Sequence, residues 1–253
     1  MREMDLNADL GEGMGDDAAM LDIVTSANVA CGAHAGSPET MFATMQMAAA
    51  RGVAVGVHPG YADPARFGRV VVPQTEAELE RLVAHQVGAA IGIAALAGVR
   101  VSHVKAHGAL YNLASEDAGV ARAIARAVRA VDAGLAVLAR AGSMAVGAAE
   151  VLGLRGVHEI FADRAYLPDG RLMPRERPGA VIHDAGVVTE RVLAMLEAGG
   201  VIAEGGVRLA LPMDSICVHG DTPGSVGIAR ALRAALRAAG HGVRPFAGAA
   251  ACR

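Results

Sequence analysis

The chain has 253 residues, a length that suits one α/β barrel, and 53% of them are hydrophobic with a formal net charge of −3. Lys and Arg form no cluster and aromatic residues make up 3% of the chain, so a nucleic-acid partner is not expected. The first residues include acids where a signal peptide would be apolar, and no apolar run is long enough to cross a bilayer. We therefore expect a cytoplasmic protein with no membrane partner.

Short apolar runs typical of buried strands alternate along the chain with Ala-rich stretches typical of helices. The predicted strands are Glu3–Asp9, Ile23–Cys31, Val53–His58, Val99–His107, Leu135–Ala139, Val157–Asp163 and Ser215–His219. The predicted helices are Pro38–Arg51, Thr75–Ala97, Ser115–Val131, Ser143–Leu152, Thr189–Glu197 and Gly224–Ala239. Ser37 and Thr75 are suited to cap the first two helices, and Glu78 would complete a capping box.

This alternation predicts parallel strands joined by right-handed helical crossovers. Seven strands indicate a seven-stranded, distorted TIM-like β/α barrel that forms a single domain over residues 1–253. A doubly wound open sheet is the alternative. Two segments interrupt the pattern: Tyr166–Ala180 is rich in Pro, Gly and Arg and is predicted to be a long loop, and Val201–Leu211 is predicted to be a small hairpin.

Polar side chains follow every predicted strand except the fifth. Binding groups in parallel α/β folds gather beyond the carboxyl ends of the strands, so these side chains are expected to converge. They are Asn7, Asp9, Glu12, His34, His58, Arg69, Lys105, His107, Asp163, Arg164, His219 and Asp221. We assign no function to the other histidines outside these strand ends, which are His85, His158, His183 and His241.

Side chains two residues apart on a strand share one face. This rule groups Asn7 with Asp9, Lys105 with His107, and His219 with Asp221. Asp5 and His103 lie deeper on two of these faces, and we interpret them as groups that satisfy each other, since burying polar groups without partners is costly.

Several of these residues also have a structural interpretation. Asp9 would suit a turn, and His58 precedes a Pro-Gly turn, but both positions favour function. Lys105 lies inside an apolar strand and is the sharpest signal, because an unpaired buried Lys is rarely tolerated; its alternative is an ion pair with Asp9 or Asp163. Asp163 and Arg164 could equally form a structural salt bridge.

Two generic motifs are absent or weak. The glycines at 11, 13 and 15 lack the Lys and Ser/Thr of a phosphate loop, and their acidic neighbours would repel phosphate. His34, His58, Asp9 and Asp221 could form a mixed metal site, but without helical spacing this signal is weak and no metal site is predicted. Cys31 and Cys217 lie in apolar runs and, with Cys252, do not suggest a disulfide framework.

Seven strand-end strings, in order along the chain, resemble those of the LamB/YcsF family of 5-oxoprolinase A subunits. The strings are DLNADLGE (5–12), ANVACGAHAG (27–36), HPGY (58–61), FGR (67–69), HVKAHGALYN (103–112), FADRAY (161–166) and CVHGD (217–221). The resemblance implies a fold similar to glycoside hydrolase/deacetylase barrels. It also implies ATP-dependent cleavage of 5-oxo-L-proline to L-glutamate in a complex with subunits B and C, and leaves a homo-oligomer open. Since the chain has no phosphate loop, ATP and Mg²⁺ are expected to be handled with the partner subunits.

With this substrate, we hypothesise that Asp9 or His58 is the general base for water and that His107 is the acid toward the ring nitrogen. Lys105 and Arg69 would hold the carboxylate or developing anion. The remaining strand-end residues would bind the substrate. Two rival hypotheses are a metal-dependent amide hydrolase or deacetylase that acts alone, and a non-catalytic subunit that only binds 5-oxoproline.

Overall fold

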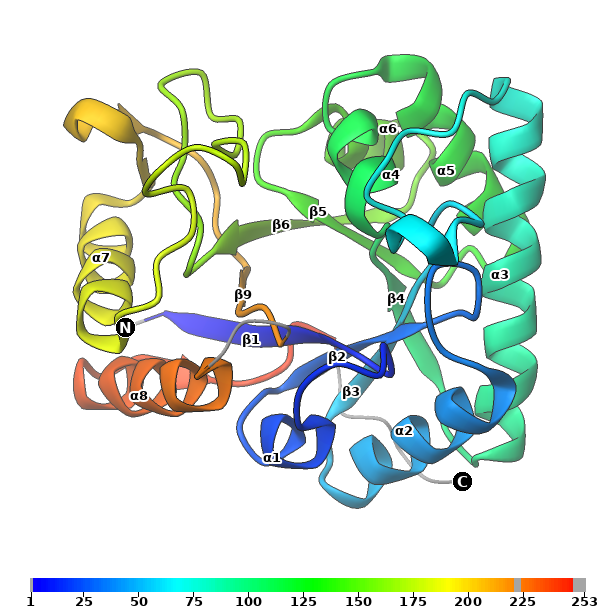
Figure 1. Ribbon diagram of the computed structural model, residues 1–253, viewed down its shortest axis with the longest axis horizontal. Helices are drawn as coiled ribbons and strands as arrows, with labels where there is room; N and C mark the ends of the chain where they lie inside the picture. The colour runs from blue at the N-terminus through cyan, green and yellow to red at the C-terminus, as the bar shows by residue number, and fades with distance from the viewer. Residues whose placement is uncertain (1, 221–223, 248–253) are drawn as a thin grey trace.

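Seven parallel strands close into a barrel in the computed structural model, which describes residues 2–220 and 224–247 (Figure 1). The strands are β1 (Glu3–Leu10), β2 (Ser26–Ala30), β3 (Ala54–His58), β4 (Val101–Val104), β5 (Ala136–Arg140), β6 (Arg155–Phe161) and β9 (Ser215–Cys217). Each strand pairs with the next in this order, and β9 pairs with both β6 and β1. The predicted seven-stranded barrel is confirmed, and the open sheet is wrong. A short strand, β10 (Gly242–Val243), extends the pairing beside the first residues of β1.

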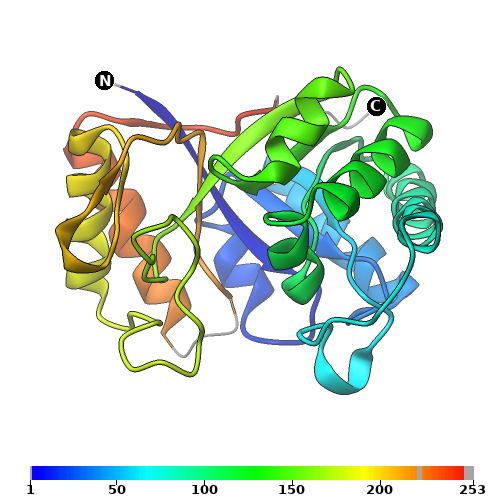
Figure 2. The same ribbon diagram turned by 90° about the horizontal axis from the view of Figure 1, so that it is seen from above.

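Helices surround the barrel on its outside (Figures 1 and 2). They are α1 (Asp17–Leu21), α2 (Pro38–Ala50), α3 (Glu76–Leu96), α4 (Gly108–Ala114), α5 (Ala118–Val131), α6 (Met144–Val151), α7 (Ala185–Ala198) and α8 (Ser225–Ala238). The Ser37 side chain caps α2, and Thr75 and Glu78 form the predicted capping box at the start of α3. By length and composition alone, α3 could cross a membrane, but here it packs along α2 and α5 on the barrel surface.

The predicted boundaries around residues 99–117 were wrong. The fourth strand ends at Val104 rather than at His107, because the backbone N–H of His107 donates to the carbonyl oxygen of Pro59 and the chain then turns into α4. Ser115 ends α4 instead of starting the next helix, and the side chain of Asp117 caps α5. Neither α1 nor α4 was expected, because both are too short to show a helical period.

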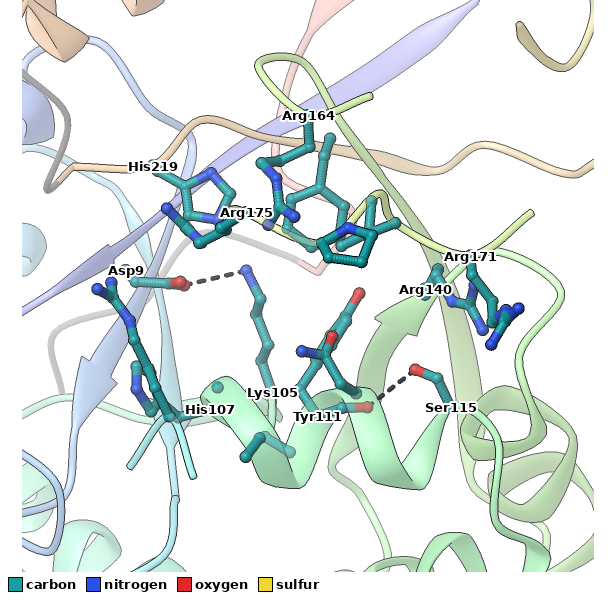
Figure 3. Close-up of a pocket in the computed structure, with 18 of the residues that line it drawn as sticks. Asp9, Lys105, His107, Tyr111, Ser115, Arg140, Arg164, Arg171, Arg175 and His219 are labelled. Atoms are coloured by element: carbon teal, nitrogen blue, oxygen red, sulfur yellow. Dashed lines mark hydrogen bonds and ion pairs between the residues drawn. The ribbon is translucent and has the colours of Figure 1, made fainter. Parts of the chain in front are cut away.

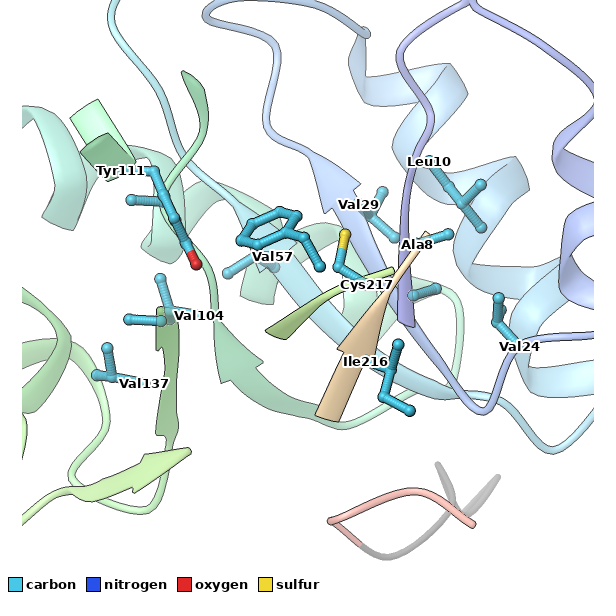
Figure 4. Packing of buried hydrophobic residues seen from close by; sticks show 14 of the residues in the cluster. Ala8, Leu10, Val24, Val29, Val57, Val104, Tyr111, Val137, Ile216 and Cys217 are labelled. Carbon is cyan, nitrogen blue, oxygen red and sulfur yellow. The ribbon is translucent and has the colours of Figure 1, made fainter. Parts of the chain in front are cut away.

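The strands carry polar side chains inside the barrel and apolar side chains outside it. On β1, Asp5 and Asn7 form hydrogen bonds with groups on other strands across the interior. Their apolar neighbours on the outer face pack with Val29, Val57 and Val104 against the helices (Figure 4). The hydrophobic core is therefore the layer between strands and helices, and the barrel interior is available for polar chemistry.

The two irregular segments lie near the mouth of the barrel. Val201–Leu211 contains the predicted hairpin, as β7 (Val201–Ile202) paired antiparallel to β8 (Arg208–Leu209) and separated by a 3₁₀ turn, η2 (Glu204–Gly206). A second 3₁₀ turn, η1 (Pro64–Arg66), follows β3. The long loop after Tyr166 folds back on itself through a bridge between Tyr166 and Leu172.

Candidate functional site

A cavity of about 450 Å³ opens where the carboxyl ends of the strands meet (Figure 3). Its floor and walls come from strand ends, including Asp9, Lys105, Phe161 and His219. Helix α4 contributes Tyr111, and residues 171–176 of the long loop form an outer wall. The site thus stands at the position that the fold predicts for a ligand.

Lys105 lies at the bottom of this cavity and is held by two carboxylates. Its Nζ is 2.8 Å from Glu159 Oε1 and 3.0 Å from Asp9 Oδ1, and it also lies 3.2 Å from Cys217 Sγ. Burial alone would lower the pKa of Lys105, but the neighbouring carboxylates raise it well above its usual value. Lys105 is therefore a fixed positive charge rather than a base.

Glu159 is fully buried and connects this lysine to the opposite wall. Its Oε1 accepts a hydrogen bond of 2.9 Å from the Asn7 amide, and its Oε2 accepts one of 2.7 Å from the Tyr111 hydroxyl. Both carboxylate oxygens of Glu159 thus accept a hydrogen bond. The hydroxyl of Tyr111 is fixed by the same carboxylate, and its pKa is raised well above its usual value by burial and by Glu159.

Three histidines and Glu12 form a compact cluster beside Asp9. His34 and His107 stack with ring centroids 3.7 Å apart, and His58 meets His107 edge to face. Glu12 Oε1 is 2.9 Å from His34 Nε2 and 3.2 Å from His107 Nδ1. We refer to Glu12, His34, His58 and His107 as the histidine cluster.

The packing of this cluster requires two glycines. A Cβ on Gly60 would lie 2.9 Å from His34 Nδ1, and a Cβ on Gly68 would lie 2.9 Å from His34 Cβ. Gly68 also has a positive φ of 60°. The glycines of the HPGY and FGR strings therefore let the backbone approach the imidazoles.

Charge in the cluster is unevenly distributed. Burial lowers the pKa of His34 to about 4, whereas the Asp9 carboxylate outweighs burial at His58 and raises its pKa. Although burial raises it, the pKa of Asp9 is held well below its usual value by His58 and Lys105. The neighbouring imidazoles of His107 and His34 likewise outweigh burial and lower the pKa of Glu12 to about 2. Both carboxyl groups are thus anionic at neutral pH.

A separate pair, Asp163 and His219, lies on the other side of the cavity. His219 Nδ1 is 2.9 Å from each Asp163 oxygen, and the charge of His219 lowers the pKa of this buried carboxyl against the effect of burial. Arg164 does not bond to Asp163; its guanidinium donates to the carbonyl oxygens of Met173 and Ala180. The interpretation of Asp163 and Arg164 as a structural salt bridge, which the sequence allowed, is therefore wrong.

Arginines line the upper part of the cavity. They are Arg69, Arg140, Arg164, Arg171 and Arg175. Figure 3 shows Arg164 and Arg175 on the side of His219, and Arg140 and Arg171 on the opposite side. Burial and the nearby charge of Arg175 lower the pKa of Arg164 to about 10. A cavity with so many guanidinium groups suits an anionic ligand.

Comparison with known proteins identifies the family of this chain. The model of the LamB/YcsF family matches residues 4–251. The chain belongs to this family. A Nitrobacter hamburgensis protein, named as the A subunit of 5-oxoprolinase, is 53% identical over 249 residues, which cover 96% of this chain and 98% of that protein. A Rhodopseudomonas palustris protein of the same name is 53% identical over 252 residues, covering 97% and 99%.

A solved family structure has the same barrel. The lactam utilization protein from Thermus thermophilus superimposes with a TM-score of 0.90 at 42% sequence identity, over 96% of this chain and all of that one. The resemblance of the strand-end strings to the LamB/YcsF family is thus confirmed.

The structure brings most of the predicted site residues together. Those that line the cavity are Asp9, Glu12, His58, Arg69, Lys105, His107, Arg164 and His219. Asn7, His34 and Asp163 lie directly behind them, each bonded to a residue of the lining. Asp221 falls outside the described residues. The weak metal set of His34, His58, Asp9 and Asp221 is replaced by a set in which Glu12 and His107 join His34 and His58.

Asp5 and His103 are structural, as predicted, but not as partners of each other. Asp5 receives hydrogen bonds from the hydroxyls of Thr25, Ser26 and Ser215. His103 Nε2 is 2.8 Å from Asn28 Oδ1, and its Nδ1 is 2.8 Å from Ser102 Oγ. Asp5 thus finds its partners on or next to the strands beside β1, whereas His103 finds its partners on its own strand and on β2.

Sequence reasoning missed Glu159, Tyr111 and three of the arginines. Arg140 was missed because the fifth strand was ended at Ala139, yet Arg140 is its last residue and is only 8% exposed. Glu159 could have been found by the argument used for Lys105, as a charge inside a buried strand. Tyr111 lies on α4, which was not expected, and Arg171 and Arg175 lie on a loop whose path no pattern predicts.

Proposed function

We propose that this chain is the A subunit of a 5-oxoprolinase and that its cavity opens the ring of 5-oxo-L-proline to give L-glutamate. The proposal rests on the relatives that carry the name of this subunit, which match nearly the full chain at 53% identity. The cavity supports it with an ionised carboxylate, a fixed cation and a histidine in reach of one small ligand. We expect the complex to be cytoplasmic.

A lactam is a stabilised amide, so its carbon needs activation before water attacks. Transfer of the γ-phosphoryl group of ATP to the lactam oxygen would form an O–P bond, release ADP and make the ring carbon electrophilic. This chain has no phosphate loop, so we assign that step, with its ATP and Mg²⁺, to partner subunits B and C. The arginines of this cavity would hold the substrate carboxylate and the phosphoryl group.

Asp9 is our proposed general base. Its carboxylate lines the cavity, and its low pKa keeps it ionised, with Oδ1 anchored by Lys105. Asp9 would take a proton from water as the water oxygen adds to the ring carbon. Lys105 would stabilise the negative charge that develops nearby.

His219 is our proposed general acid, in place of the His107 of the sequence hypothesis. Both ring nitrogens of His107 already have partners, Phe67 O at 2.8 Å and the His58 ring at 3.0 Å. His219 is held through Nδ1 by Asp163, which orients Nε2 for a ligand. His219 would protonate the ring nitrogen as the carbon–nitrogen bond breaks, leaving γ-glutamyl phosphate. A second water would then release phosphate and L-glutamate.

The test is the formation of L-glutamate from 5-oxo-L-proline by the purified chain, with and without ATP and the two partner subunits. The proposal predicts product only when all are present. Product without ATP or partners would instead favour a hydrolase that acts alone, and tight 5-oxoproline binding with unchanged turnover in Asp9 and His219 variants would favour a binding subunit.

A further inference from the structure

Two backbone carbonyl groups determine which ring nitrogen carries the hydrogen in two imidazoles of the histidine cluster. His58 Nδ1 is 2.7 Å from the carbonyl oxygen of Lys105, and His107 Nε2 is 2.8 Å from that of Phe67. A carbonyl oxygen only accepts, so each of these nitrogens carries the hydrogen. In the neutral rings, the lone pairs are then on His58 Nε2 and His107 Nδ1.

These two lone-pair nitrogens face each other at 3.0 Å. Glu12 Oε1, which also only accepts, is 3.2 Å from His107 Nδ1 and 3.9 Å from His58 Nε2. His34 directs Nε2 at the same carboxylate oxygen at 2.9 Å, and its buried Nδ1 has no partner among the described residues. His58 Nε2 also lies 3.3 Å from Asp9 Oδ2. His34 and His107 stack in nearly parallel planes, so one of these rings must turn before both can direct a lone pair at one ion. The cluster still gathers four donor atoms in one place, which suits a bound cation.

We propose that Glu12, His34, His58 and His107 bind one divalent transition-metal ion of the zinc type. Three imidazole nitrogens and one carboxylate oxygen are donors that zinc accepts in a tetrahedral site. Bonds of roughly 2.0–2.1 Å place neighbouring tetrahedral ligands about 3.3 Å apart. Four of the six separations between the ligand atoms run from 2.9 to 3.9 Å, on both sides of this value. The four ligand atoms all lie within 4.8 Å of one another.

The surrounding charges favour a divalent ion. Asp9 and Glu159 contact Lys105, and Glu12 contacts the histidines, so this region holds three carboxylates and one ammonium group. These four groups sum to a formal charge of −2. A divalent ion would neutralise that charge.

The residues around the histidine cluster hold its rings in the way that is usual at a metal site. Backbone carbonyls fix the rings of His58 and His107 through their distal nitrogens, which is how second-sphere contacts orient metal-binding histidines. Three of the four ligands line the cavity, so the ion would border the space proposed for 5-oxoproline. The inference goes beyond the proposed function, because metal binding is measured without substrate, ATP or partner subunits.

The experiment uses the full chain without an affinity tag, stripped with a chelator and then titrated with Zn²⁺ or Co²⁺. Metal per chain is measured after desalting, and the absorption of the cobalt form reports coordination geometry. We expect one ion per chain, a tetrahedral cobalt spectrum and a higher melting temperature with metal. His34→Ala should lose the ion, and His85→Ala, at an exposed position on α3, should keep it.

A second variant covers the case in which His34→Ala fails to fold. Glu12→Gln keeps the side-chain volume and should weaken metal affinity at least about tenfold, as even second-sphere changes do. X-ray absorption of the wild-type zinc form should show nitrogen and oxygen ligands only. The inference is overturned if the wild-type chain retains no more metal than Glu12→Gln, or if the cobalt spectrum is octahedral.

Discussion

His219 Nδ1 lies 2.9 Å from both carboxylate oxygens of Asp163, and the Phe161 ring stacks against the same imidazole. The carboxylate and the aromatic ring together fix the orientation of His219 at the cavity wall. Because Asp163 is buried and anionic, it accepts the hydrogen of Nδ1 and leaves Nε2 directed away from this carboxylate. A side chain that donates a proton to the nitrogen of the 5-oxoproline ring needs a fixed orientation of this kind.

Loss of this donor should slow turnover without unfolding the chain. His219→Gln is expected to lower kcat in the assembled complex by about 10²–10⁴-fold, the usual contribution of a general acid. Asp163→Asn should lower kcat less, because the imidazole remains. His183→Gln, at an exposed position outside the cavity, is the matched control. Full activity in His219→Gln would remove the histidine from the proposed mechanism.

The Lys105–Glu159 ion pair should dominate the stability of the barrel interior. Lys105→Met leaves Glu159 buried without its cation and is expected to cost about 3–5 kcal/mol of unfolding free energy. Adding Glu159→Gln should restore part of that loss. Denaturant titrations of the two single variants and the double variant measure the coupling, and additive losses would contradict it.

The success of sequence reasoning at Lys105 and its failure at Arg140 have physical causes. A lysine inside an apolar strand is conspicuous, because burying an ammonium group needs partners that only a site or an ion pair supplies. Arg140 ends a strand, and strand ends are set by tertiary pairing that a local pattern does not contain. The barrel itself was predictable from the alternation of strands and helices.

The contacts between side chains from different strands were harder to predict than the strand end at which each side chain lies. The sequence placed His34, His58 and His107 near one mouth, but the tautomers depend on carbonyls of Lys105 and Phe67 that come from other turns of the chain. Such pairings carry no local sequence signal.

Burial of Asp5 should give the fold a pH dependence. Burial raises its pKa from 3.8 to about 6, so between these values the native state binds more protons than the unfolded state. The unfolding free energy should therefore fall by about 3 kcal/mol through this residue as pH rises from about 4 to above 6. Asp5→Asn should remove that fall in denaturant titrations over the same range.

A matched control is Glu197→Gln, which removes an exposed carboxyl on α7. Its stability should follow that of the wild-type chain across the range. If Asp5→Asn and the wild-type chain keep a constant difference from about pH 4 to about pH 7, the assigned role of Asp5 is wrong.

Close packing around the histidine cluster can be tested at a glycine. Gly60→Ala would place a methyl carbon 2.9 Å from His34 Nδ1 and 3.1 Å from His107 Cβ, so the rings must move. We expect about 1–3 kcal/mol of destabilisation and a loss of turnover. Gly88→Ala on α3 meets no atom within 4 Å and should be neutral or up to about 1 kcal/mol more stable. Equal activity of the two variants would show that the cluster tolerates displacement.

The most direct test of the proposed ring opening compares two forms of the chain in the complex with both partner subunits, ATP and 5-oxo-L-proline. One form is the wild-type chain and the other is Asp9→Asn, and L-glutamate formation is followed for each. The wild-type complex should form glutamate, and the Asp9→Asn complex should be slower by about 10²–10⁴-fold with its fold and assembly intact. Equal rates for the two complexes would contradict the assignment of ring opening to this cavity.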